Sequence, residues 1–259
     1  MRNSKKISGI DRLMNNSEFR KQSIEYFNTS LGSPDIKISQ FPKYVKEEDL
    51  QNFIFKLEVF KKILKVHGSI IELGVLFGGG LMTWAKLSSI FEPLNHSRKI
   101  IGYDTFSGFP SVSKNDKINN GISKTHSISS AQKNDFCVDS FDDLLKSITL
   151  YDSERCKGSI KKIELVKGDI TKTIPKYLKA NPHLVISLLN LDLDLYKPTK
   201  FALKHLLPRM VRGSIICFDE LNHPRWPGET IAVMEELGLN NIKLERFEFA
   251  PNQSYAVLT

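Results

Sequence analysis

The chain alternates short continuous apolar runs with longer segments in which apolar residues recur every three to four positions. The first pattern is typical of buried strands and the second of amphipathic helices. The apolar runs predict strands at 68–73, 98–104, 162–169, 182–193, 213–219, 242–249 and 254–259. The periodic segments predict helices at 47–66, 81–91, 199–210 and 228–239. Strands that alternate with helices indicate an α/β fold with a doubly wound, mostly parallel seven-stranded sheet, and two consecutive strands at the end predict an antiparallel finish.

Two polar stretches interrupt this pattern. Residues 1–40 are polar and weakly periodic, so we expect residues 1–66 to form a helical extension that covers an α/β domain of residues 67–259. Residues 110–160 are rich in Ser, Asn, Asp and Lys, with one weak helical pattern at 140–148. A segment of this length between regular elements is usually a functional lid or a disordered excursion. We expect a lid that becomes ordered over the site only when ligands bind.

Composition narrows the class of protein. With 259 residues and 41% apolar content, the chain suits one α/β domain with a large core. It contains no apolar run of the roughly 20 residues that a membrane helix needs, and its first residues contain no apolar segment suited to a signal peptide. We therefore expect a soluble, cytoplasmic protein with no membrane partner. Three widely spaced cysteines (Cys137, Cys156 and Cys217) argue against a disulfide framework and a zinc site.

The net charge of +8 allows two interpretations. A basic protein suits an anionic partner such as a nucleotide-linked substrate, nucleic acid or an acidic membrane. The lysines are scattered, however, and never form a block longer than two residues, which is also typical of an ordinary solvated surface. Charge alone does not decide between these interpretations.

Acidic residues follow five successive predicted strands. In an open α/β sheet, ligands bind outside the carboxyl ends of the strands, so these side chains should gather at one edge of the sheet. The acids are Glu72, Asp104, Asp169, the pair Asp192 and Asp194, and the pair Asp219 and Glu220. Polar residues can simply mark where strands emerge from the core, but five in succession predict a ligand site.

A glycine-rich turn follows the first of these strands, in the sequence ELGVLFGGG of residues 72–80. Position 76 is Leu, so the G-x-G-x-x-G pattern of dinucleotide sites is not met, and no Gly-Lys-Ser/Thr follows as in phosphate-binding loops. Glu72, two residues before Gly74, suits a ligand with an amino group. Asp104 suits ribose hydroxyls, and Asp169 suits an adenine amino group. Amino acid, ribose and adenine together describe S-adenosylmethionine.

The acids on the two later strands require a second explanation. Carboxylates brought close together repel each other unless one holds a proton or a cation lies between them. Hard oxygen ligands without a nearby histidine pair favour Mg²⁺ over zinc. Mg²⁺ near the sulfonium methyl group would bind a substrate hydroxyl and lower its pKa, while a neighbouring carboxylate accepts the proton. The alkoxide would then attack the methyl group in line, which predicts O-methyl transfer to an alcohol.

Four blocks of the sequence resemble a known family. The blocks IIELGVLFGGGL, IGYDTFSGFP, LDLDLYKPT and IICFDELN are closely similar to the macrocin O-methyltransferase family (TylF/MycF-like), which methylates sugar hydroxyls. The resemblance covers roughly residues 41–259. It implies a Rossmann-like class I methyltransferase fold, Mg²⁺ dependence and a homodimer or larger oligomer, with N-terminal elements that help to cover the active site.

The resemblance also assigns residues by position. It implies Asp192, Asp219 and Glu220 as metal ligands, Asp192 or Asp194 as the general base, Glu72 and Gly74 at the methionine part of the cofactor, and Asp104 at its ribose. Gly78 and Asp169 complete the set of expected cofactor-binding residues. The chain has Asp192-Leu193-Asp194 where better-known members tend to carry Asp-Gly-Asp, and Asp219-Glu220 where they tend to carry an Asp pair. The longer Glu side chain places its oxygens one bond further from the backbone.

Four residues outside the acids are candidates for holding the acceptor. Arg225 and Trp226 would bind a sugar or its phosphate, with the indole stacked on the ring; a loop anchored by a buried Trp is the alternative. Tyr44 and Tyr196 would reach the substrate, although simple packing also explains Tyr44. His223 lies near the acids in the sequence and is either a base or an ordinary surface histidine.

The sequence does not name the acceptor. A nucleotide-linked deoxysugar, the end of a glycan as in polysaccharide modification, or a glycosylated metabolite would all suit the site, and the basic charge favours a nucleotide sugar. Two other functions stay open, namely an oxygenase- or hydroxylase-like relative on the same fold and a non-catalytic anion-binding module. The first would need an iron site, for which the chain lacks the usual pattern of His and acidic residues. Nucleic acid is not an expected partner, because the strand-end acids would repel its phosphates.

Overall fold

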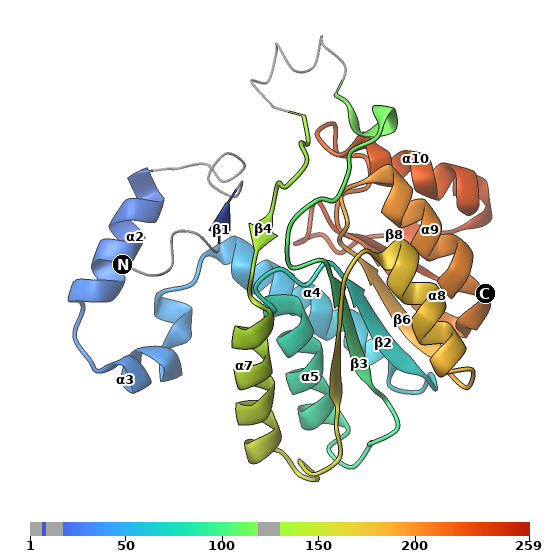
Figure 1. The fold of residues 1–259 in the computed structure, drawn as a ribbon. Helices are drawn as coiled ribbons and strands as arrows, with labels where there is room; N and C mark the ends of the chain where they lie inside the picture. The colour runs from blue at the N-terminus through green and yellow to red at the C-terminus, as the bar shows by residue number, and fades with distance from the viewer. Residues whose placement is uncertain (1–6, 9–17, 119–129) are drawn as a thin grey trace.

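The computed structural model describes residues 7–8, 18–118 and 130–259. Its centre is a seven-stranded sheet in the order β5-β3-β2-β6-β7-β9-β8 (Figure 1). The strands are β2 (Ser69–Leu73), β3 (Ile100–Asp104), β5 (Ile163–Lys167), β6 (Ile186–Leu191), β7 (Met210–Phe218), β8 (Leu244–Glu245) and β9 (Ser254–Val257). The first five strands in the sheet are parallel, whereas β9 runs antiparallel to both of its neighbours. The predicted α/β fold with a mostly parallel sheet is therefore confirmed.

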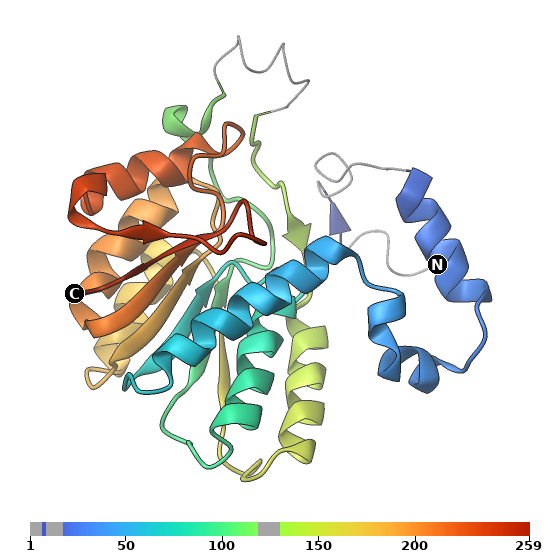
Figure 2. The same ribbon diagram turned by 180° about the vertical axis from the view of Figure 1, so that it is seen from behind.

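Helices cover both faces of the sheet (Figures 1 and 2). One layer consists of α4 (Glu47–Ile63), α5 (Gly79–Phe91) and α7 (Phe141–Glu154), and the other of α8 (Ile170–Ala180), α9 (Tyr196–Leu206) and α10 (Pro227–Glu236). In the described part of the chain, none of the helices is both long and apolar enough to cross a membrane.

Two hydrophobic cores lie between these layers and the sheet, because successive side chains of a strand point to opposite faces. Ile70 and Ile100 pack toward α4, α5 and α7, whereas their neighbours Ile71 and Ile101 pack toward α8, α9 and α10. All five residues of β2 are buried, as expected for a parallel strand covered on both sides. This arrangement places the carboxyl ends of β2, β3, β5, β6 and β7 along one edge of the sheet.

Three elements differ from the prediction. Helix α8 was not expected. Pro175 lies inside it and the residues around Pro175 are polar, so the sequence pattern did not indicate the helix that begins after the capping residue Asp169. Helix α7 extends well beyond the predicted 140–148, and it is held by buried apolar side chains. Strand β8 has only two residues where the sequence predicted eight, at 242–249.

The buried face of α4 also differs from the expected one. The three- to four-residue periodicity that predicted the helix at 47–66 includes Phe53 and Ile54 among its apolar positions and so assigns them to the core, but these side chains are 40% and 41% exposed. The buried stripe is instead formed by Phe55, Lys56, Val59, Phe60 and Ile63. Helix α4 therefore belongs to the core of the α/β fold, and it presents a lysine to that core.

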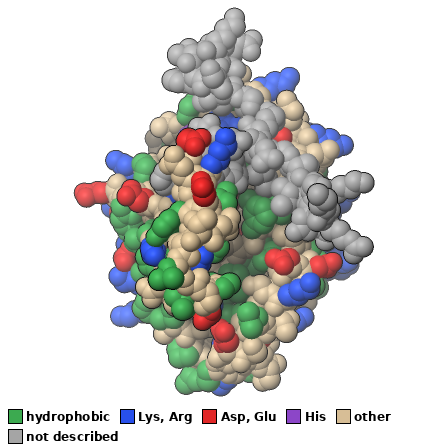
Figure 3. Space-filling view, turned by 90° about the vertical axis from the view of Figure 1, so that its left-hand side faces the viewer, with side chains coloured by type: hydrophobic (Ala, Val, Ile, Leu, Met, Phe, Trp, Pro, Cys, Tyr) green, Lys and Arg blue, Asp and Glu red, His purple; other side chains and the backbone are tan. Residues whose placement is uncertain are grey.

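The N-terminal helices form an arm, defined here as residues 18–46. It contains α2 (Glu18–Thr29), α3 (Pro34–Ser39) and the 3₁₀ helix η1 (Phe41–Lys43), and it stands to one side of the sheet (Figures 1 and 2). Ahead of the arm, β1 (Ile7–Ser8) pairs antiparallel with β4 (Cys137–Val138). The arm leaves many large apolar side chains exposed to solvent (Figure 3): Ile24, Tyr26, Phe27, Leu31, Ile36, Ile38 and Phe41.

Candidate active site

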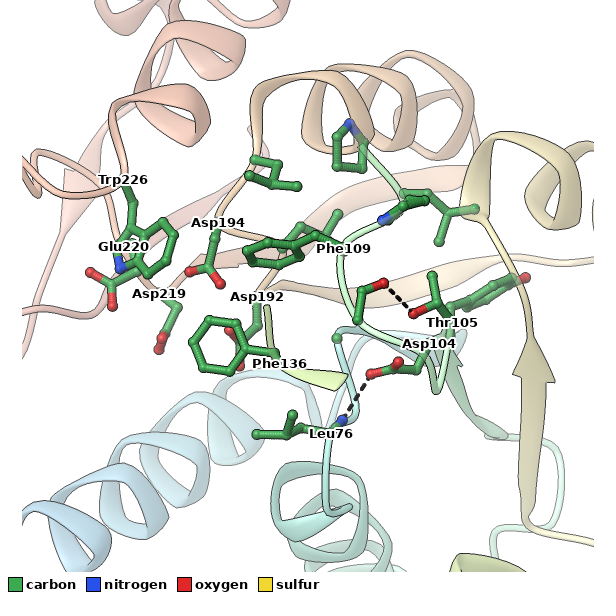
Figure 4. A pocket seen from close by; sticks show the side chains of 18 of the residues that line it. Leu76, Asp104, Thr105, Phe109, Phe136, Asp192, Asp194, Asp219, Glu220 and Trp226 are labelled. Carbon is green, nitrogen blue, oxygen red and sulfur yellow. Dashed lines mark hydrogen bonds between the residues drawn. The ribbon is translucent and has the colours of Figure 1, made fainter. Parts of the chain in front are cut away.

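A cavity of about 430 Å³ opens at the carboxyl edge of the sheet. Eight of the residues singled out in the sequence line it: Gly74, Asp104, Asp169, Asp192, Asp194, Asp219, Glu220 and Trp226. Six others do not line it, namely Tyr44, Glu72, Gly78, Tyr196, His223 and Arg225. Figure 4 shows two halves, with Asp104 on one side and the acids that follow β6 and β7 on the other.

The glycine-rich turn from β2 to α5 forms the floor of the first half. Gly74 has φ +90°, and a Cβ atom at this position would lie 1.9 Å from the carbonyl oxygen of Asp192. Leu76 also adopts a left-handed backbone, with φ 51°, a conformation that costs a residue of this size about 1–3 kcal/mol. The turn is therefore pressed against the end of β6, where only glycine fits at position 74.

Asp104 holds this turn in place. One of its carboxylate oxygens accepts hydrogen bonds from the backbone N–H groups of Val75 and Leu76, each at 2.8 Å (Figure 4). The other oxygen accepts from the N–H of Phe106 at 2.7 Å. The carboxylate that the sequence predicted to bind ribose is thus at the cavity, and it also has a structural task that the sequence did not reveal.

Glu72 does not reach the cavity, contrary to the expectation that it binds an amino group there. Its side chain is buried under the start of α5, where it accepts a hydrogen bond from Trp84 Nε1 at 2.5 Å. A Cβ atom on Gly80 would lie 2.1 Å from Glu72 Oε1, so the helix begins directly on the carboxylate. Burial raises the pKa of Glu72, and nearby Lys56 lowers it.

Asp169 lies at the cavity and caps α8. Its Oδ1 accepts hydrogen bonds from the backbone N–H of Thr171 at 2.9 Å and from Thr171 Oγ1 at 2.8 Å. A capping carboxylate of this kind is common at helix N-termini. The predicted contact of Asp169 with an adenine amino group stays a prediction.

Four acids, Asp192, Asp194, Asp219 and Glu220, line the second half of the cavity, on the side away from Asp104 (Figure 4). Asp194 has φ 60° and lies in a tight turn in which the N–H of Leu195 donates to the carbonyl of Leu193 at 2.6 Å. This turn directs the side chain of Asp194 back toward Asp192 (Figure 4). Strained backbone of this kind is concentrated at functional sites.

The carboxyl groups strongly affect one another. Burial, followed by the charges of Asp219 and Asp194, raises the pKa of Asp192 well above its usual value. Burial and Asp219 raise the pKa of Asp194 to about 7 and that of Glu220 to about 8. Without a cation, these groups must therefore hold protons near neutral pH.

The donor set suits a hard divalent cation. All four side chains offer carboxylate oxygens, and Glu220 Oε2 is buried without a hydrogen-bond partner. Glu229 at the start of α10 is fully buried, and neither of its oxygens has a hydrogen-bond partner. Within the described residues, however, no three His, Cys, Asp or Glu side chains converge closely enough to hold one ion. The donor atoms are of the type that Mg²⁺ prefers, but the described side chains do not form an assembled site for it.

Three aromatic rings form a wall beside the acids. Phe109 lies 5.5 Å from Phe136 and 6.2 Å from Trp226, measured between ring centroids. The guanidinium of Arg225 lies over the Trp226 ring at 5.4 Å, outside the cavity lining. Phe109 and Phe136 were not predicted, because their partners come from segments far apart in the sequence.

Tyr44 and Tyr196 do not line the cavity. Tyr44 packs within the arm against Tyr26 and Phe27, with ring centroids 5.8 and 5.2 Å apart. The hydroxyl of Tyr196 donates to Glu235 at 2.6 Å on α10. Tyr44 therefore packs within the arm, which was the alternative considered for it, and Tyr196 is hydrogen-bonded to α10. The predicted contact of either tyrosine with the substrate stays a prediction.

Two residues of α4 were missed by the sequence analysis. Glu48 in its first turn lines the cavity, and Lys56 is buried with its Nζ 5.2 Å from the centroid of the Trp84 ring. A charged residue in an amphipathic helix is normally assigned to solvent, so the periodicity of α4 contained no signal for either role.

We expect the stability of the metal-free protein to fall as the pH rises. In the unfolded chain these carboxyl groups titrate near 4, whereas the fold holds protons on Asp194 and Glu220 up to pKa values of about 7 and 8. Between these limits the folded state binds more protons, so the free energy of unfolding decreases with pH. Thermal unfolding in EDTA should show a Tm lower by roughly 10 °C or more at about pH 8 than at about pH 5. Burial also raises the pKa of Glu229 well above its usual value, so Glu229→Gln should flatten this slope. A Tm that rises over the window would contradict the assignment.

Comparison with known proteins gave one family and several related structures. The model of the family described as macrocin-O-methyltransferase (TylF) matches residues 48–235. The crystal structure of CalS11, a calicheamicin methyltransferase, has a TM-score of 0.85 and 31% identity over 94% of each chain. An apo structure of CalS11, described as a TDP-rhamnose 3′-O-methyltransferase in calicheamicin biosynthesis, has a TM-score of 0.78 and 29% identity over 94% of this chain and 96% of that one.

The O-methyltransferase NovP shares the fold, with a TM-score of 0.61 and 20% identity over 81% of this chain and 80% of the other. A sequence comparison with curated proteins found no match.

Proposed function

The chain belongs to the TylF macrocin O-methyltransferase family, and from this premise we propose that it methylates a sugar hydroxyl with the help of Mg²⁺. Membership makes the protein an O-methyltransferase with S-adenosylmethionine as its methyl donor. The family also decides against the hydroxylase-like and non-catalytic alternatives. Metal, acceptor and residue roles are the parts that we propose.

The observation that carries the proposal is the division of one cavity into two halves. The glycine-rich turn and Asp104 lie on one side, and the four acids with their aromatic wall lie on the other (Figure 4). A methyl donor bound over the turn would present its sulfonium methyl toward Asp192 in the middle. An acceptor hydroxyl among the acids would then face that methyl group.

We assign the proton transfer to Asp192 or Asp194. Mg²⁺ held by Asp192, Asp219 and Glu220 would supply Lewis acidity that lowers the pKa of the acceptor hydroxyl. One of the two Asp carboxylates accepts the hydroxyl proton, and the oxygen attacks the methyl carbon. The S–CH₃ bond breaks as the O–CH₃ bond forms, and S-adenosylhomocysteine leaves. Asp194 suits the role of base, because it is the carboxylate of the two that the proposed ligand set leaves free.

The aromatic wall supports a sugar as the acceptor. Phe109, Phe136 and Trp226 offer apolar surface next to carboxylates, which suits a ring with an apolar face and hydroxyl edges. A nucleotide-linked deoxysugar is our first candidate, because CalS11 is described as acting on TDP-rhamnose and this chain is basic. A glycan end in polysaccharide biosynthesis and a glycosylated metabolite are the alternatives.

Calorimetry with S-adenosylhomocysteine in Mg²⁺ buffer tests the cofactor site. We expect micromolar binding, about −8 kcal/mol, that Asp104→Ala abolishes because the glycine-rich turn loses two hydrogen bonds and the backbone N–H of Phe106 loses a third. A methylation assay with TDP-rhamnose and methyl rhamnoside, each with Mg²⁺ or EDTA, then tests acceptor and metal. Full activity in EDTA would contradict the proposed role of Mg²⁺. If neither sugar is methylated, rhamnose is not the acceptor.

We also propose that the extension of residues 1–66 and the segment 110–160 cover the site. Pro110 and Phe136 line the cavity from the second segment. Residues 1–6, 9–17 and 119–129 of these two stretches lie outside the described residues. Ligand-dependent ordering predicts that S-adenosylhomocysteine and Mg²⁺ slow protease cleavage between 110 and 140. Equal cleavage with and without ligands would contradict it.

We propose that the protein forms a homodimer in which the exposed apolar side chains of the arm are buried against a second copy of the chain. Leu31 and Ile38 are 94% and 72% exposed, and an isolated set of short helices with such residues outside is poorly stabilised. We expect wild type to sediment as a dimer and Leu31→Asp with Ile38→Asp to shift it to monomer, whereas Lys21→Asp in the same arm should not. A monomeric wild type would contradict this proposal.

A further inference from the structure

Asp116 is a buried carboxylate outside the cavity lining. It ends the 3₁₀ helix η2 (Lys114–Asp116), and its side chain is 2% exposed. Its Oδ2 accepts hydrogen bonds from the backbone N–H of Ser113 at 2.6 Å and from Ser113 Oγ at 2.7 Å. Its Oδ1 accepts from the backbone N–H of Tyr196 at 2.6 Å. Hydrogen bonds to an ionised carboxylate are among the strong ones, so Asp116 joins its own turn firmly to the start of α9.

Helix α9 begins without a capping side chain of its own. The residue before it is Leu195, which makes no side-chain hydrogen bond to the first turn, whereas Ser, Thr, Asp or Asn is preferred at this position. Asp116 takes over part of this task from a distant segment, because the N–H that it binds belongs to Tyr196, the first residue of the helix. Negative charge at a helix N-terminus is favourable. The contact therefore stabilises both the carboxylate and the helix.

Helix α10 is fitted to the same carboxylate. Gly228 is buried in its first turn. A Cβ atom at this position would lie 2.1 Å from Asp116 Oδ1 and 2.5 Å from the backbone nitrogen of Tyr196. Only glycine lets α10 approach so closely, so η2, α9 and α10 meet at one carboxylate oxygen.

The aromatic wall is built from the segments that meet here. Leu195, directly before α9, and Trp226, directly before α10, are 1% and 5% exposed and belong to one buried cluster. Phe109, which precedes η2, packs against this cluster together with Phe136. All four side chains line the cavity. The Asp116 contact therefore fixes the spacing of the chain segments that carry the wall.

We propose that Asp116 is a positioning residue for the acceptor half of the cavity. It holds Phe109, Leu195 and Trp226 at the spacing that fits one face of the acceptor ring, and it touches neither acceptor nor cofactor itself. The consequence for the acceptor rests on the proposed function. The hold on Trp226 does not, and it is measured separately.

Acrylamide quenching of tryptophan fluorescence, without cofactor or acceptor, tests the hold on the wall. The chain has two tryptophans, and Trp226→Phe leaves the emission of Trp84 alone, so subtraction isolates Trp226. Asp116→Ala should raise the quenching of Trp226 severalfold, because the released segments let water reach the indole. Lys114→Ala, which removes an exposed side chain from the same 3₁₀ helix, is the matched control and should quench as wild type does.

Methylation kinetics test the consequence for the acceptor, with TDP-rhamnose or methyl rhamnoside, whichever the wild type methylates. Asp116→Ala should raise the KM for the sugar by about tenfold or more while kcat changes by less than about threefold, because positioning contributes equally to ground-state and transition-state binding. The affinity for S-adenosylhomocysteine should be unchanged. Asp116→Asn still accepts from Tyr196, but its amide nitrogen accepts nothing from Ser113, so its KM should lie between the two.

Gly228→Ala disturbs the same contact from α10, and it decides the question if Asp116→Ala cannot be obtained folded. It should also raise Trp226 quenching and the KM, and the double variant should add little, because both changes break one contact. Unchanged quenching of Trp226 in the folded variants, or an unchanged KM for the sugar, would overturn the proposal. If the wild type methylates neither sugar, the proposed acceptor is wrong, whereas increased quenching in Asp116→Ala would still support the role of Asp116 in the wall.

Discussion

Asp192→Asn should lower the rate of methyl transfer by about a thousandfold while leaving the affinity for S-adenosylhomocysteine within about twofold. Asp192 lies between the two halves of the cavity, and both of its proposed tasks need a carboxylate. An amide accepts no proton at neutral pH and is a weaker ligand for Mg²⁺. The shape of the side chain is conserved, so the fold and the cofactor half should be unaffected.

Single-turnover methylation and calorimetry measure these two effects separately. Asp194→Asn should be compared in the same assay, because the variant that abolishes the pH dependence near 7 identifies the base. Asp49→Asn, in the exposed first turn of α4, is the matched control and should retain full activity. If Asp192→Asn kept more than about a tenth of the activity, neither role assigned to Asp192 would hold.

Gly74→Ala should destabilise the fold by about 3 kcal/mol or more and abolish activity. The new methyl group would lie 1.9 Å from the carbonyl oxygen of Asp192, and φ +90° is unfavourable for any residue with a Cβ atom. The contact is with backbone on both sides, so no side-chain rotation relieves it. Relief requires β2 and β6 to separate at the point where Asp192 enters the cavity.

Gly79→Ala is the matched control for this substitution. Gly79 lies five residues further along the same glycine-rich turn, and a Cβ atom there meets nothing within 4 Å. As the first residue of α5 it should tolerate Ala or gain a few tenths of a kcal/mol. Urea unfolding of the two variants measures the difference. Equal urea midpoints for Gly74→Ala and Gly79→Ala would mean that the turn can move away from Asp192 at little cost in stability.

The sequence predicted the sheet and the position of most of the acids at its carboxyl edge, because both signals are local. Apolar runs mark the parallel strands, and acids that end such runs must meet at one edge. Asp192, Asp194, Asp219 and Glu220 lie together for this reason. The block IGYDTFSGFP identified Asp104 as a candidate. The hydrogen bonds that Asp104 accepts from Val75 and Leu76 could not be predicted, because α5 and β3 separate these residues in the sequence.

The predictions that differ from the structure concern the direction in which individual side chains point. Strand β2 is buried on both faces, so its sequence contains no alternation that would show Glu72 pointing under α5. On α4, apolar residues occur on more than one side. Phe55 and Lys56 are buried in the core, whereas Phe53 and Ile54 are exposed. Both outcomes were decided by neighbours distant in the sequence, Trp84 among them.

The position of β9 in the sheet has a consequence for how the protein is made. Strand β7, which leads into Asp219, has β6 on one side, but its other edge is closed only by β9, after α10 and β8 have followed in the chain. Until then Ile215, Ile216 and Cys217 form an open edge of the kind through which unfinished chains associate. We therefore expect the yield of soluble protein to depend on how quickly residues 254–257 dock, and slower synthesis at low temperature to favour it.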